Sequence, residues 1–440
     1  MLARVGFGTI KRPPPTVPCT GDCGTHSKFA LLRNTRQTAL RKHSHPLARS
    51  NLFVSPPSPN RTNLPKEIMA FPEFPWKGPS QSFVTHAQVL DYLYDYQQHF
   101  DLQKYIHTGC TVQHLKVLTT TGDNADQPVS CLSPETEHWP RIRLDWTIAE
   151  SDGTAASVSR EFDAVCVCNG HYGVPAVPEL DGLKEHYKGR LMHSIAYDDP
   201  AVFAGQKVLC IGGRASGSDL AREIAVHADA VYLSDSVAPP MDETGTPVTK
   251  YNVAWVPKTT AVLADGSVQF DLGCNMNPVV DVIVFCTGYD YSFPFIDEET
   301  SNISLDFATG SRRVQPVLEQ FWHAVNPNIC FAGLPHSVLP FPLFELQMTA
   351  AVRQWQDWTL PTDKASRMVM AAKDAASGGE GMVNGRMPQD THFLGPAQWD
   401  YCRRMAEYAG TYDDEMENYI ATNKVSCRCV AAVLLLLCCL

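Results

Sequence analysis

Three short apolar runs, each leading directly into glycine, constrain the fold of this 440-residue chain more than any other feature. They are FDAVCVC at 162–168, KVLCIG at 207–212 and VDVIVFC at 280–286, and all are biased toward β-branched side chains. Continuous apolar runs of this length are typical of strands that are buried on both faces of a parallel sheet. Because helix-like pieces lie between them, the alternation predicts an α/β architecture.

One helix is predicted by periodicity, within the segment HAQVLDYLYDYQQHF at 86–100. Thr85 suits an N-cap, because its hydroxyl can accept a hydrogen bond from a backbone amide of the first turn. Apolar side chains then recur at helical spacing, at Val89, Leu90, Leu93, Tyr96 and Phe100. We expect this stripe to belong to the core rather than to a site.

The segment KVLCIGGRASGSDLAREI (207–224) predicts a strand, a glycine turn and a helix, which is the context in which a dinucleotide binds. Gly212 ends the strand, Gly217 allows the helix to pack closely on it, and amides at the helix N-terminus can face a pyrophosphate. Arg214 stands where the common G-x-G-x-x-G pattern has its middle glycine. Three interpretations are open. Arg214 turns outward to bind a phosphate, or Gly213 lets the backbone approach the phosphate closely in place of the missing glycine, or the turn holds no ligand.

The end of the next strand bears on the choice of nucleotide. About 20 residues beyond such a turn, an acid commonly binds a ribose 2′-hydroxyl. Here VYLSDS (231–236) supplies Asp235, flanked by Ser234 and Ser236. Asp235 favours NAD over NADP by charge, but a nearby Arg or Lys can override it, and a merely solvated acid is the simpler alternative.

The other two apolar runs end alike. FDAVCVCNGHYGVPAVPEL (162–180) passes into Asn169 and Gly170, and VDVIVFCTGYDYSFPF (280–295) passes into Thr287 and Gly288. An aromatic residue and a proline-containing exit follow in both. In flavoproteins with two dinucleotide domains, such segments cross between the domains, where a small residue permits close approach of the backbone. Together with the turn between them, these two strand ends predict a pair of crossings.

Composition limits the partners of the chain. The formal net charge is −11, yet residues 1–65 carry ten Lys and Arg against one acid, Asp22, so the remainder is strongly acidic and nucleic acid is excluded as a partner of the main body. The 15 cysteines are scattered, which indicates a reducing compartment and neither a disulfide framework nor a metal site. The isolated pairs at 19 and 23 and at 427 and 429 lack two further ligands.

Both ends of the chain differ from its middle. Residues 1–50 show no sustained periodicity and read as poorly ordered, with a mitochondrial-type presequence as the alternative. CVAAVLLLLCCL (429–440) is too short to span a bilayer, which needs about 20 residues, although it could associate weakly with a membrane or pack on a partner. We expect a cytoplasmic protein, with association with the ER membrane left open.

Several segments, in order along roughly 51–420, resemble flavin-containing monooxygenases, most closely the S-oxygenating plant-type branch. The segment YKGRLMHSIAY (187–197) is similar to the identifying F-x-G-x-x-x-H-x-x-x-Y motif, with Tyr187 in place of Phe and with Gly189, His193 and Tyr197 retained. GGRASGSD is itself typical of that branch. The further matching segments are RTNLPKEIMAFPEFPW (61–76), VIVFCTGYDYSFPF (282–295), FAGLPHSVLPFPLFELQ (331–347) and HFLGPAQWDY (392–401).

The resemblance implies two Rossmann-like domains, FAD and NADPH as cofactors, and an N,N-dimethylaniline-type monooxygenase activity. Hydride would reduce the flavin, dioxygen would add to give a C4a-hydroperoxide, and a thioether or amine would take the distal oxygen. The predicted parts are a basic segment at 1–50, the FAD domain at 51–180 and 286–425, the inserted NADP domain at 181–285 and an apolar tail at 426–440.

The resemblance also implies roles for individual residues. Asn63 would lie beside the flavin as the catalytic residue, with a turn residue that bonds its own backbone as the alternative. Gln347 and Phe341 would approach the flavin or the substrate, although a helix start explains them equally well, and we expect His193 to be a structural histidine. The predicted cofactor-binding residues are Gly212, Gly213, Arg214, Ser216, Gly217, Asp219, Ser234, Thr287, Gly288, Asn169, Gly170 and Gln347.

The N-terminus departs from the family pattern. VGFGTIK offers Gly6 and Gly8, but Lys11 occupies the third glycine position and Pro13–Pro15 follow where a helix should run. We therefore expect the first strand and helix of the FAD domain to be missing, neighbouring strand faces to be uncovered and flavin absorbance to be weak or absent. The alternative function is a truncated, non-catalytic relative that binds at most a nicotinamide nucleotide. A disulfide reductase would need a redox C-x-x-C beside the nucleotide fold, which the sequence lacks.

Overall fold

The computed structural model describes most of the chain from Thr62 to Asn423, together with two N-terminal strands. The described residues are 3–9, 28–33, 62–118, 140–149, 154–237, 242–271, 274–296, 304–306, 313–377 and 392–423. The apolar run at 429–440, the two terminal cysteine pairs and the rest of the basic segment lie outside them. Within these residues, no helix combines the length and the apolar composition needed to cross a membrane.

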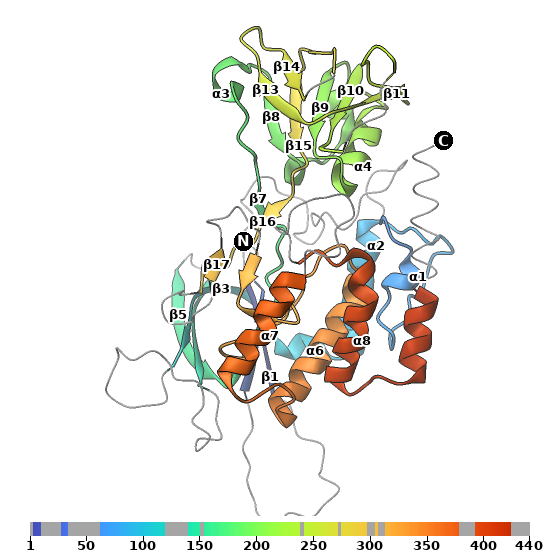
Figure 1. Ribbon diagram of the computed structural model, residues 1–440. Helices are drawn as coiled ribbons and strands as arrows, with labels where there is room; N and C mark the ends of the chain where they lie inside the picture. The colour runs from blue at the N-terminus through green and yellow to red at the C-terminus, as the bar shows by residue number, and fades with distance from the viewer. Residues whose placement is uncertain are drawn as a thin grey trace, which may run out of the picture.

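Two layered units make up the fold, one above the other in Figure 1. The upper unit is built on a six-stranded sheet and the lower unit on a nine-stranded sheet. Two short strands, β7 (Val174–Pro175) and β16 (Tyr289–Asp290), pair with each other where the chain passes between the units. The chain enters the upper unit after β7 and leaves it before β16, so the upper unit is an insertion in the lower one.

The upper sheet is almost entirely parallel, in the order β11-β12-β10-β9-β15-β8. Only β11 runs antiparallel to its neighbour. The apolar runs at 207–212 and 280–286 form two adjacent inner strands, β9 and β15, as the sequence predicts. The strands are β8 (Arg190–His193), β9 (Lys207–Ile211), β10 (Ala230–Ser234), β11 (Thr249–Lys250), β12 (Val253–Val256) and β15 (Val282–Phe285).

Different elements cover the two faces of the upper sheet. Helix α4 (Ala215–Ile224) buries Leu220 and Ile224 against one face, beside Val208 and Cys210 of β9. The other face carries the hairpin of β13 (Thr259–Val262) and β14 (Val268–Phe270), whose inward side chains meet Leu209 of β9. Because β9 is buried on both faces from Val208 to Ile211, these four residues are all apolar, and only Lys207 at its start is exposed. The short elements α3 (Leu183–His186), η3 (Ser194–Ala196) and η4 (Pro200–Phe203) complete this unit.

The lower sheet is mixed, in the order β19-β20-β21-β6-β2-β1-β3-β4-β5. The third apolar run forms β6, which lies parallel to β2 and β21, whereas β3, β4 and β5 form an antiparallel meander. The strands after β2 are β3 (Ile106–Val117), β4 (Ile142–Ala149), β5 (Ala155–Phe162), β6 (Ala164–Val167), β19 (Val317–Leu318), β20 (Trp322–His323) and β21 (Ile329–Phe331). A separate pair, β17 (Ser304–Asp306) and β18 (Arg313–Gln315), is also antiparallel.

Alternation along β6 divides the lower core into two clusters. Val165 and Val167 face one cluster with residues of the meander, and Cys166 faces the other, beneath α6 (Pro340–Asp357). Helix α8 (Gln398–Ala409) packs beside α6 on that second face, and α7 (Lys364–Ser377) contacts β19. Such division is expected because successive side chains of a strand point to opposite faces of its sheet.

The N-terminal strands differ from the expectation for this part of the chain. We expected an uncovered gap where the first strand of the FAD domain belongs, but β1 (Ala3–Thr9) and β2 (Lys28–Arg33) lie in the middle of the lower sheet. They pair antiparallel with each other, so they are not a strand–turn–helix unit. Gly6 and Gly8 lie inside the ladder, opposite Leu31 and Phe29, rather than in a turn. Both segments have an extended backbone, so they can pair with each other in the sheet although they lack the glycine motif.

The predicted helix over 86–100 is α2 (His86–His99). The Thr85 hydroxyl accepts from the Gln88 amide, and the Gln88 side chain accepts from the Thr85 amide, which completes a capping box. Tyr92 of this helix is buried, and its ring stacks on the ring of Trp76 with centroids 4.1 Å apart. Val89, Leu93 and Tyr96 of the predicted stripe therefore belong to a core cluster, whereas Phe100 at its end is exposed. The short α1 (Lys66–Met69) and η2 (Leu102–Tyr105) flank this region.

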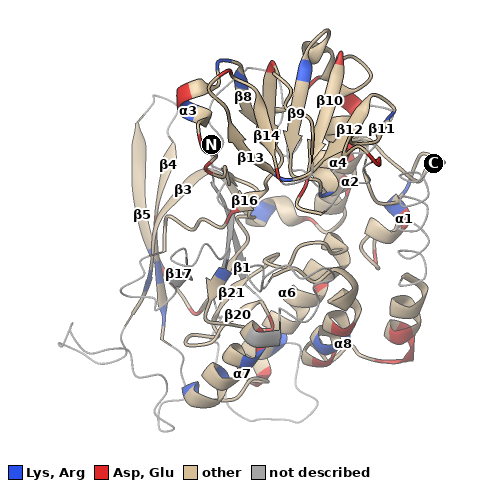
Figure 2. Ribbon diagram, turned by 45° about the horizontal axis from the view of Figure 1, so that its top comes forward, with Lys and Arg blue, Asp and Glu red and all other residues tan. Residues whose placement is uncertain are grey.

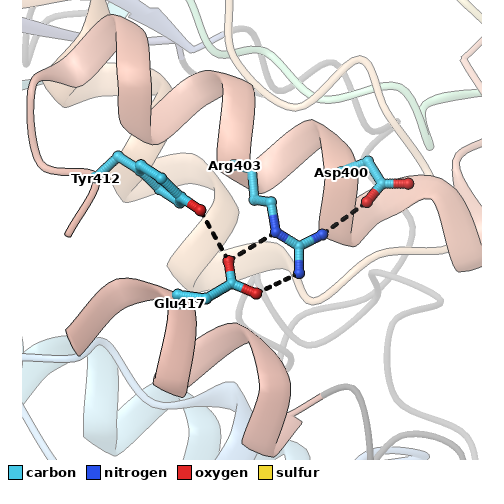
Figure 3. Close-up of polar contacts among 4 residues, drawn as sticks. All are labelled: Asp400, Arg403, Tyr412 and Glu417. Carbon is cyan, nitrogen blue, oxygen red and sulfur yellow. Dashed lines mark hydrogen bonds and ion pairs between the residues drawn. The ribbon is translucent and has the colours of Figure 1, made fainter. Parts of the chain in front are cut away.

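A polar cluster holds the last described helix, 414–423, against α8 (Figure 3). Arg403 donates to both carboxylate oxygens of Glu417, over 2.7 Å from Nε and 2.6 Å from Nη2. Asp400 accepts from Arg403 Nη1 at 2.7 Å, and the Tyr412 hydroxyl donates to Glu417 Oε2 at 3.1 Å. A guanidinium that pairs bidentately with a carboxylate fixes orientation as well as distance. Elsewhere on the described surface, Lys and Arg are interspersed with Asp and Glu (Figure 2).

Candidate nucleotide site and its surroundings

The two predicted crossings are bound to each other. The Thr287 hydroxyl donates to the carbonyl of Ala176, and the Ala176 amide donates to the carbonyl of Gly288 at 3.0 Å. Asn169 Nδ2 donates to the carbonyl of Ser292 at 3.0 Å, and Gly170 takes φ +71°. Three of the four residues that the strand ends singled out therefore join the two passages of the chain, Asn169 and Thr287 through their side chains and Gly288 through its carbonyl. Gly170 contributes a turn in the left-handed region beside them.

The turn after β9 requires glycine at two positions. Gly212 has φ +107°, and a Cβ placed on it would lie 2.5 Å from the carbonyl oxygen of Cys286. A Cβ on Gly217, in the first turn of α4, would lie 1.7 Å from the carbonyl oxygen of Gly212. No side chain other than hydrogen fits such distances without movement of the backbone. The turn is thus packed closely both on α4 and on the end of β15, as the predicted glycine roles require.

The N-terminus of α4 presents backbone amides without a side-chain cap. Arg214 is the N-cap residue, and its side chain makes no capping hydrogen bond, while the Ser218 hydroxyl donates to the Gly213 carbonyl at 2.8 Å. The amides of the first helical turn, which include those of Ser216 and Gly217, have no acceptor within the helix itself. With the positive end of the helix dipole, they form an arrangement that binds phosphate.

Arg214 links this turn to the lower unit. Its guanidinium carbon lies 5.8 Å from the centroid of the Phe393 ring. Phe393 in turn lies against His336, with ring centroids 5.4 Å apart. No sequence pattern singled out Phe393, although it belongs to the HFLGPAQWDY segment. Arg214 therefore reaches across to the lower unit, and a phosphate at the α4 N-terminus would compete with Phe393 for the guanidinium.

Asp235 and Ser234, at the end of β10, lie in different surroundings. The Asp235 carboxylate is directly beside Gly213, where a Cβ would lie 2.5 Å from Asp235 Oδ2, and it accepts from the Ser236 amide at 2.6 Å. The Ser234 hydroxyl is buried, donates to the Pro257 carbonyl and accepts from both the amide and the hydroxyl of Thr259. Three bonds use the full capacity of a hydroxyl. Asp235 borders the glycine turn, whereas Ser234 holds two segments of the chain together.

Beneath the turn, α4 carries two buried acids. Asp219 and Glu223 are 7% exposed each, and Arg222 forms an ion pair with Asp219. Burial raises the pKa of Asp219 to about 6 despite the opposing effect of Arg222. Burial also raises the pKa of Glu223, which Tyr197 opposes by donating its hydroxyl proton to Glu223 Oε2 over 2.7 Å. Asp219 thus lies on the buried face of the helix whose first turn would hold the nucleotide, not at the phosphate itself.

His193 has both ring nitrogens engaged. Its Nδ1 accepts from the Ile195 amide at 3.2 Å, so the proton resides on Nε2, which donates to the Gly288 carbonyl at 3.0 Å. The carbonyl belongs to the second crossing, so the motif histidine fixes the end of β8 on that crossing. This is the structural role that we expected.

The segment around Asn63 is anchored by its neighbours. Thr62 and Lys66 hold it against residues 79–84: the Thr62 amide donates to the Val84 carbonyl at 2.7 Å, and Lys66 Nζ donates to the carbonyls of Pro79 and Gln81. Asn63 itself is half-buried. The glycine turn contacts the lower unit through Arg214 and Phe393, and Phe393 belongs to a different segment from Asn63. A position of Asn63 beside a flavin therefore stays a prediction.

Gln347 lies wholly inside the lower unit. Its Oε1 accepts from the Gly333 amide at 3.1 Å, and its Nε2 donates to the Tyr401 hydroxyl at 2.8 Å. Gly333 has φ +78° in the A-G-L turn after β21, and Tyr401 belongs to α8. Phe341 is also buried, stacked on Phe71 with centroids 5.2 Å apart. These contacts give Gln347 and Phe341 packing roles, and binding of a cofactor by Gln347 stays a prediction.

The residues present fit a nicotinamide nucleotide better than they fit the pyrophosphate of a flavin. At β9 and α4, the close approach at Gly217 and the uncapped helix amides could hold a phosphate. Among the described residues, no glycine turn leads from β1 into a helix, and both glycines of β1 are paired within the sheet. No group of three or more His, Cys, Asp or Glu residues that could hold a metal ion occurs in the described parts of the chain.

Comparisons with known proteins show what the chain is similar to. Residues 60–241 match the sequence model described as FMO-like, flavin-binding monooxygenase-like. The flavin-containing monooxygenase FMO GS-OX-like 2 of Arabidopsis thaliana is 32% identical over 69% of this chain and 60% of its own length. FMO GS-OX-like 4 of the same plant is 32% identical over 82% of this chain and 76% of its own length. The chain thus spans three fifths of the first relative.

Solved structures show the same fold. The S-allyl-L-cysteine S-oxygenase of Allium sativum superposes with a TM-score of 0.66 at 28% identity, covering 83% of this chain and 78% of that one. Tmm of a Pelagibacter strain superposes with a TM-score of 0.60 at 19% identity, covering 82% of this chain and 74% of that one. The predicted class, an α/β fold with two Rossmann-like units, is confirmed.

Proposed function

The chain belongs to the flavin-containing monooxygenase family, as the resemblance predicted, and from this premise we propose that it oxygenates the sulfur of small thioethers at the expense of NADPH and dioxygen. Members of this family are oxidoreductases that use FAD and NADPH. The observation that carries the proposal is the close-packed turn between β9 and α4, where Gly217 lies against the Gly212 carbonyl beside the crossing at Cys286. The turn places a phosphate cradle next to the passage between the two units.

The residues of the turn have distinct tasks in this proposal. The amides of Ser216 and Gly217 bind the pyrophosphate of the nucleotide, and Arg214 leaves Phe393 to add a guanidinium to a phosphate. Gly213, which has no side chain, lets the Asp235 carboxylate lie against the turn, where it would meet the adenosine ribose. Asp219 acts indirectly, by fixing the helix whose first turn contributes these amides.

The paired crossings orient the reactants. A bound flavin supplies the activation of dioxygen, and the chain must hold the nucleotide against it and exclude water. Asn169, Thr287 and His193 stiffen the crossings through their hydrogen bonds to backbone carbonyls. We propose that Asn63 donates its amide to the reacting oxygen or to the nicotinamide amide. These contacts would keep the distance between the two cofactors constant through turnover.

Sulfur is the preferred acceptor atom in this proposal because the solved relative with 28% identity is described as an S-oxygenase of S-allyl-L-cysteine. A soft, neutral thioether needs no proton removed before it accepts oxygen, so the site requires no strong general base. Oxygenation of tertiary amines such as N,N-dimethylaniline is the second acceptor class, and competition between a thioether and an amine separates the two.

The test uses the full chain purified in the presence of FAD. We expect NADPH oxidation that yields a sulfoxide from a simple thioether, and the absorption spectrum of the same sample tests the prediction, made from the N-terminal sequence, that flavin is bound weakly. Gly217→Ala should abolish NADPH oxidation, whereas Gly173→Ala, where an added Cβ meets nothing within 4 Å, should leave it unchanged. Nucleotide binding without flavin and without sulfoxide would refute the proposal and identify the chain as a non-catalytic binding relative.

A further inference from the structure

A cluster of sulfur atoms lies in the lower core at the end of β6. Cys166 Sγ is 3.4 Å from Cys168 Sγ and 3.4 Å from Met348 Sδ of α6. Cys330, opposite Cys166 in the adjacent strand β21, interacts with the same thiol. None of the three cysteines forms a disulfide in the structure. Cys168, one residue beyond β6, continues the alternation of the strand, so its side chain lies on the same face as that of Cys166.

The three thiols differ in their access to solvent. Cys166 and Cys330 are completely buried, whereas Cys168 is half-buried where the chain leaves β6. Burial raises the pKa values of Cys166 and Cys330, so neither ionises readily. An oxidant dissolved in water therefore meets Cys168 first.

Cys168 lies just beyond the hydrogen-bonded ladder of β6. Cys168 follows the last residue of β6 and precedes Asn169 and Gly170, and Gly170 has φ +71°. A disulfide bond is about 2.05 Å long, so the two sulfurs must approach by somewhat more than 1 Å. One end of the pair is held in the sheet, and the other lies in a loop that can supply this movement.

We propose that Cys166 and Cys168 are a peroxide-sensitive pair that forms a reversible disulfide. Hydrogen peroxide oxidises the Cys168 thiol to a sulfenic acid and is reduced to water. The Cys166 sulfur then attacks the Cys168 sulfur, and the sulfenic hydroxyl leaves as water with the Cys166 proton. In total, one peroxide and two thiols give one disulfide and two waters, and a dithiol reductant reverses the change.

The source of peroxide rests on the proposed function. A flavin monooxygenase that consumes NADPH without transferring oxygen to substrate releases hydrogen peroxide, and Cys168 leads directly into the crossing beside the nucleotide unit. Asn169, the next residue, donates to the Ser292 carbonyl of the second crossing. Formation of the disulfide would lengthen this hydrogen bond. The connection between the crossings would therefore loosen when NADPH is consumed without oxygen transfer to the substrate.

The experiment exposes the reduced full chain to added hydrogen peroxide, without FAD or NADPH, and maps its thiols by mass spectrometry. Both cysteines lie in one tryptic peptide, 161–184. We expect alkylation of this peptide to fall by about tenfold or more, with a mass lower by two hydrogens that dithiothreitol restores. Cys274, a half-buried thiol in the upper unit, reports that peroxide acted.

Two variants test the order of events. Cys166→Ser should trap a sulfenic acid at Cys168, detected as a dimedone adduct, and Cys168→Ser should leave Cys166 reduced at the same peroxide dose. The inference is overturned if peptide 161–184 keeps both thiols while Cys274 is oxidised, or if Cys168→Ser loses the Cys166 thiol as fast as the wild type. Because no turnover is needed, failure of thioether oxygenation would leave this result unaffected.

Discussion

The hydroxyl of Tyr197 donates its proton to Glu223 over 2.7 Å, joining the last residue of the H-x-x-x-Y motif to the buried face of α4. Tyr197→Phe removes the donor and leaves a buried carboxylate oxygen unpaired. We expect the free energy of unfolding to fall by about 1–3 kcal/mol and the affinity for NADPH to decrease, because α4 carries the phosphate cradle. Denaturant titration and nucleotide titration measure the two effects.

The exposed Tyr105, whose substitution by Phe should change neither quantity, is the matched control for this variant. Unchanged stability and affinity in Tyr197→Phe would show that the hydrogen bond does not support α4.

Gly217→Ala places a Cβ about where the Gly212 carbonyl oxygen now lies, at a separation of 1.7 Å. The helix must move away from the turn, so we expect the NADPH affinity to fall by about tenfold or more and stability to fall by about 1–3 kcal/mol. Isothermal titration with NADPH checks the affinity. Gly173→Ala is the control, and retention of full affinity in Gly217→Ala would contradict the assignment of this turn.

Asp219 makes stability depend on pH in a defined direction. Burial raises its pKa to about 6, above the value in the unfolded chain. An acid whose pKa is raised by folding contributes stability that is present below the unfolded pKa and is lost as the pH rises through the folded one. Between about pH 4 and pH 6, the wild type should lose about 2–3 kcal/mol relative to Asp219→Asn. Urea denaturation of both proteins at several pH values gives this difference, and parallel curves would contradict the assignment.

Gln347→Leu separates a packing role from a cofactor role. The substitution leaves the buried Gly333 amide without its acceptor, so we expect a loss of stability of about 1–3 kcal/mol in the apoprotein as well as in the presence of FAD. Thermal or denaturant unfolding without FAD is the measurement, and Gln98→Leu on the exposed side of α2 is the control. An apoprotein of unchanged stability that has lost flavin affinity would instead support the cofactor role.

Asp235→Asn tests the choice of nucleotide. The carboxylate borders Gly213, where it would repel a 2′-phosphate and attract a 2′-hydroxyl. Removing its charge should raise the affinity for NADPH relative to that for NADH by about tenfold. Asp229→Asn, at the opposite end of β10, makes the same change in net charge away from the turn. Equal shifts in the two variants would show that the effect is one of overall charge.

The local elements follow from local sequence. The β-branched runs predicted β6, β9 and β15, and the periodicity after Thr85 predicted α2, because each depends on residues a few positions apart. The requirement for glycine at 217 has the same short range, because an added Cβ would meet the Gly212 carbonyl of the same turn, whereas Gly212 packs on Cys286 of a distant strand end.

Long-range contacts decided the rest. Ser234 had the sequence position of a nucleotide contact, yet its hydroxyl bonds to Pro257 and Thr259 instead. Gln347 bonds to the hydroxyl of Tyr401, which lies 54 residues away in the chain. No local pattern reveals which partner a buried hydrogen-bonding group will find. The orientation of β1 and β2 shows the same limit, because an extended segment can pair in either direction and its neighbours in the sheet determine which one forms.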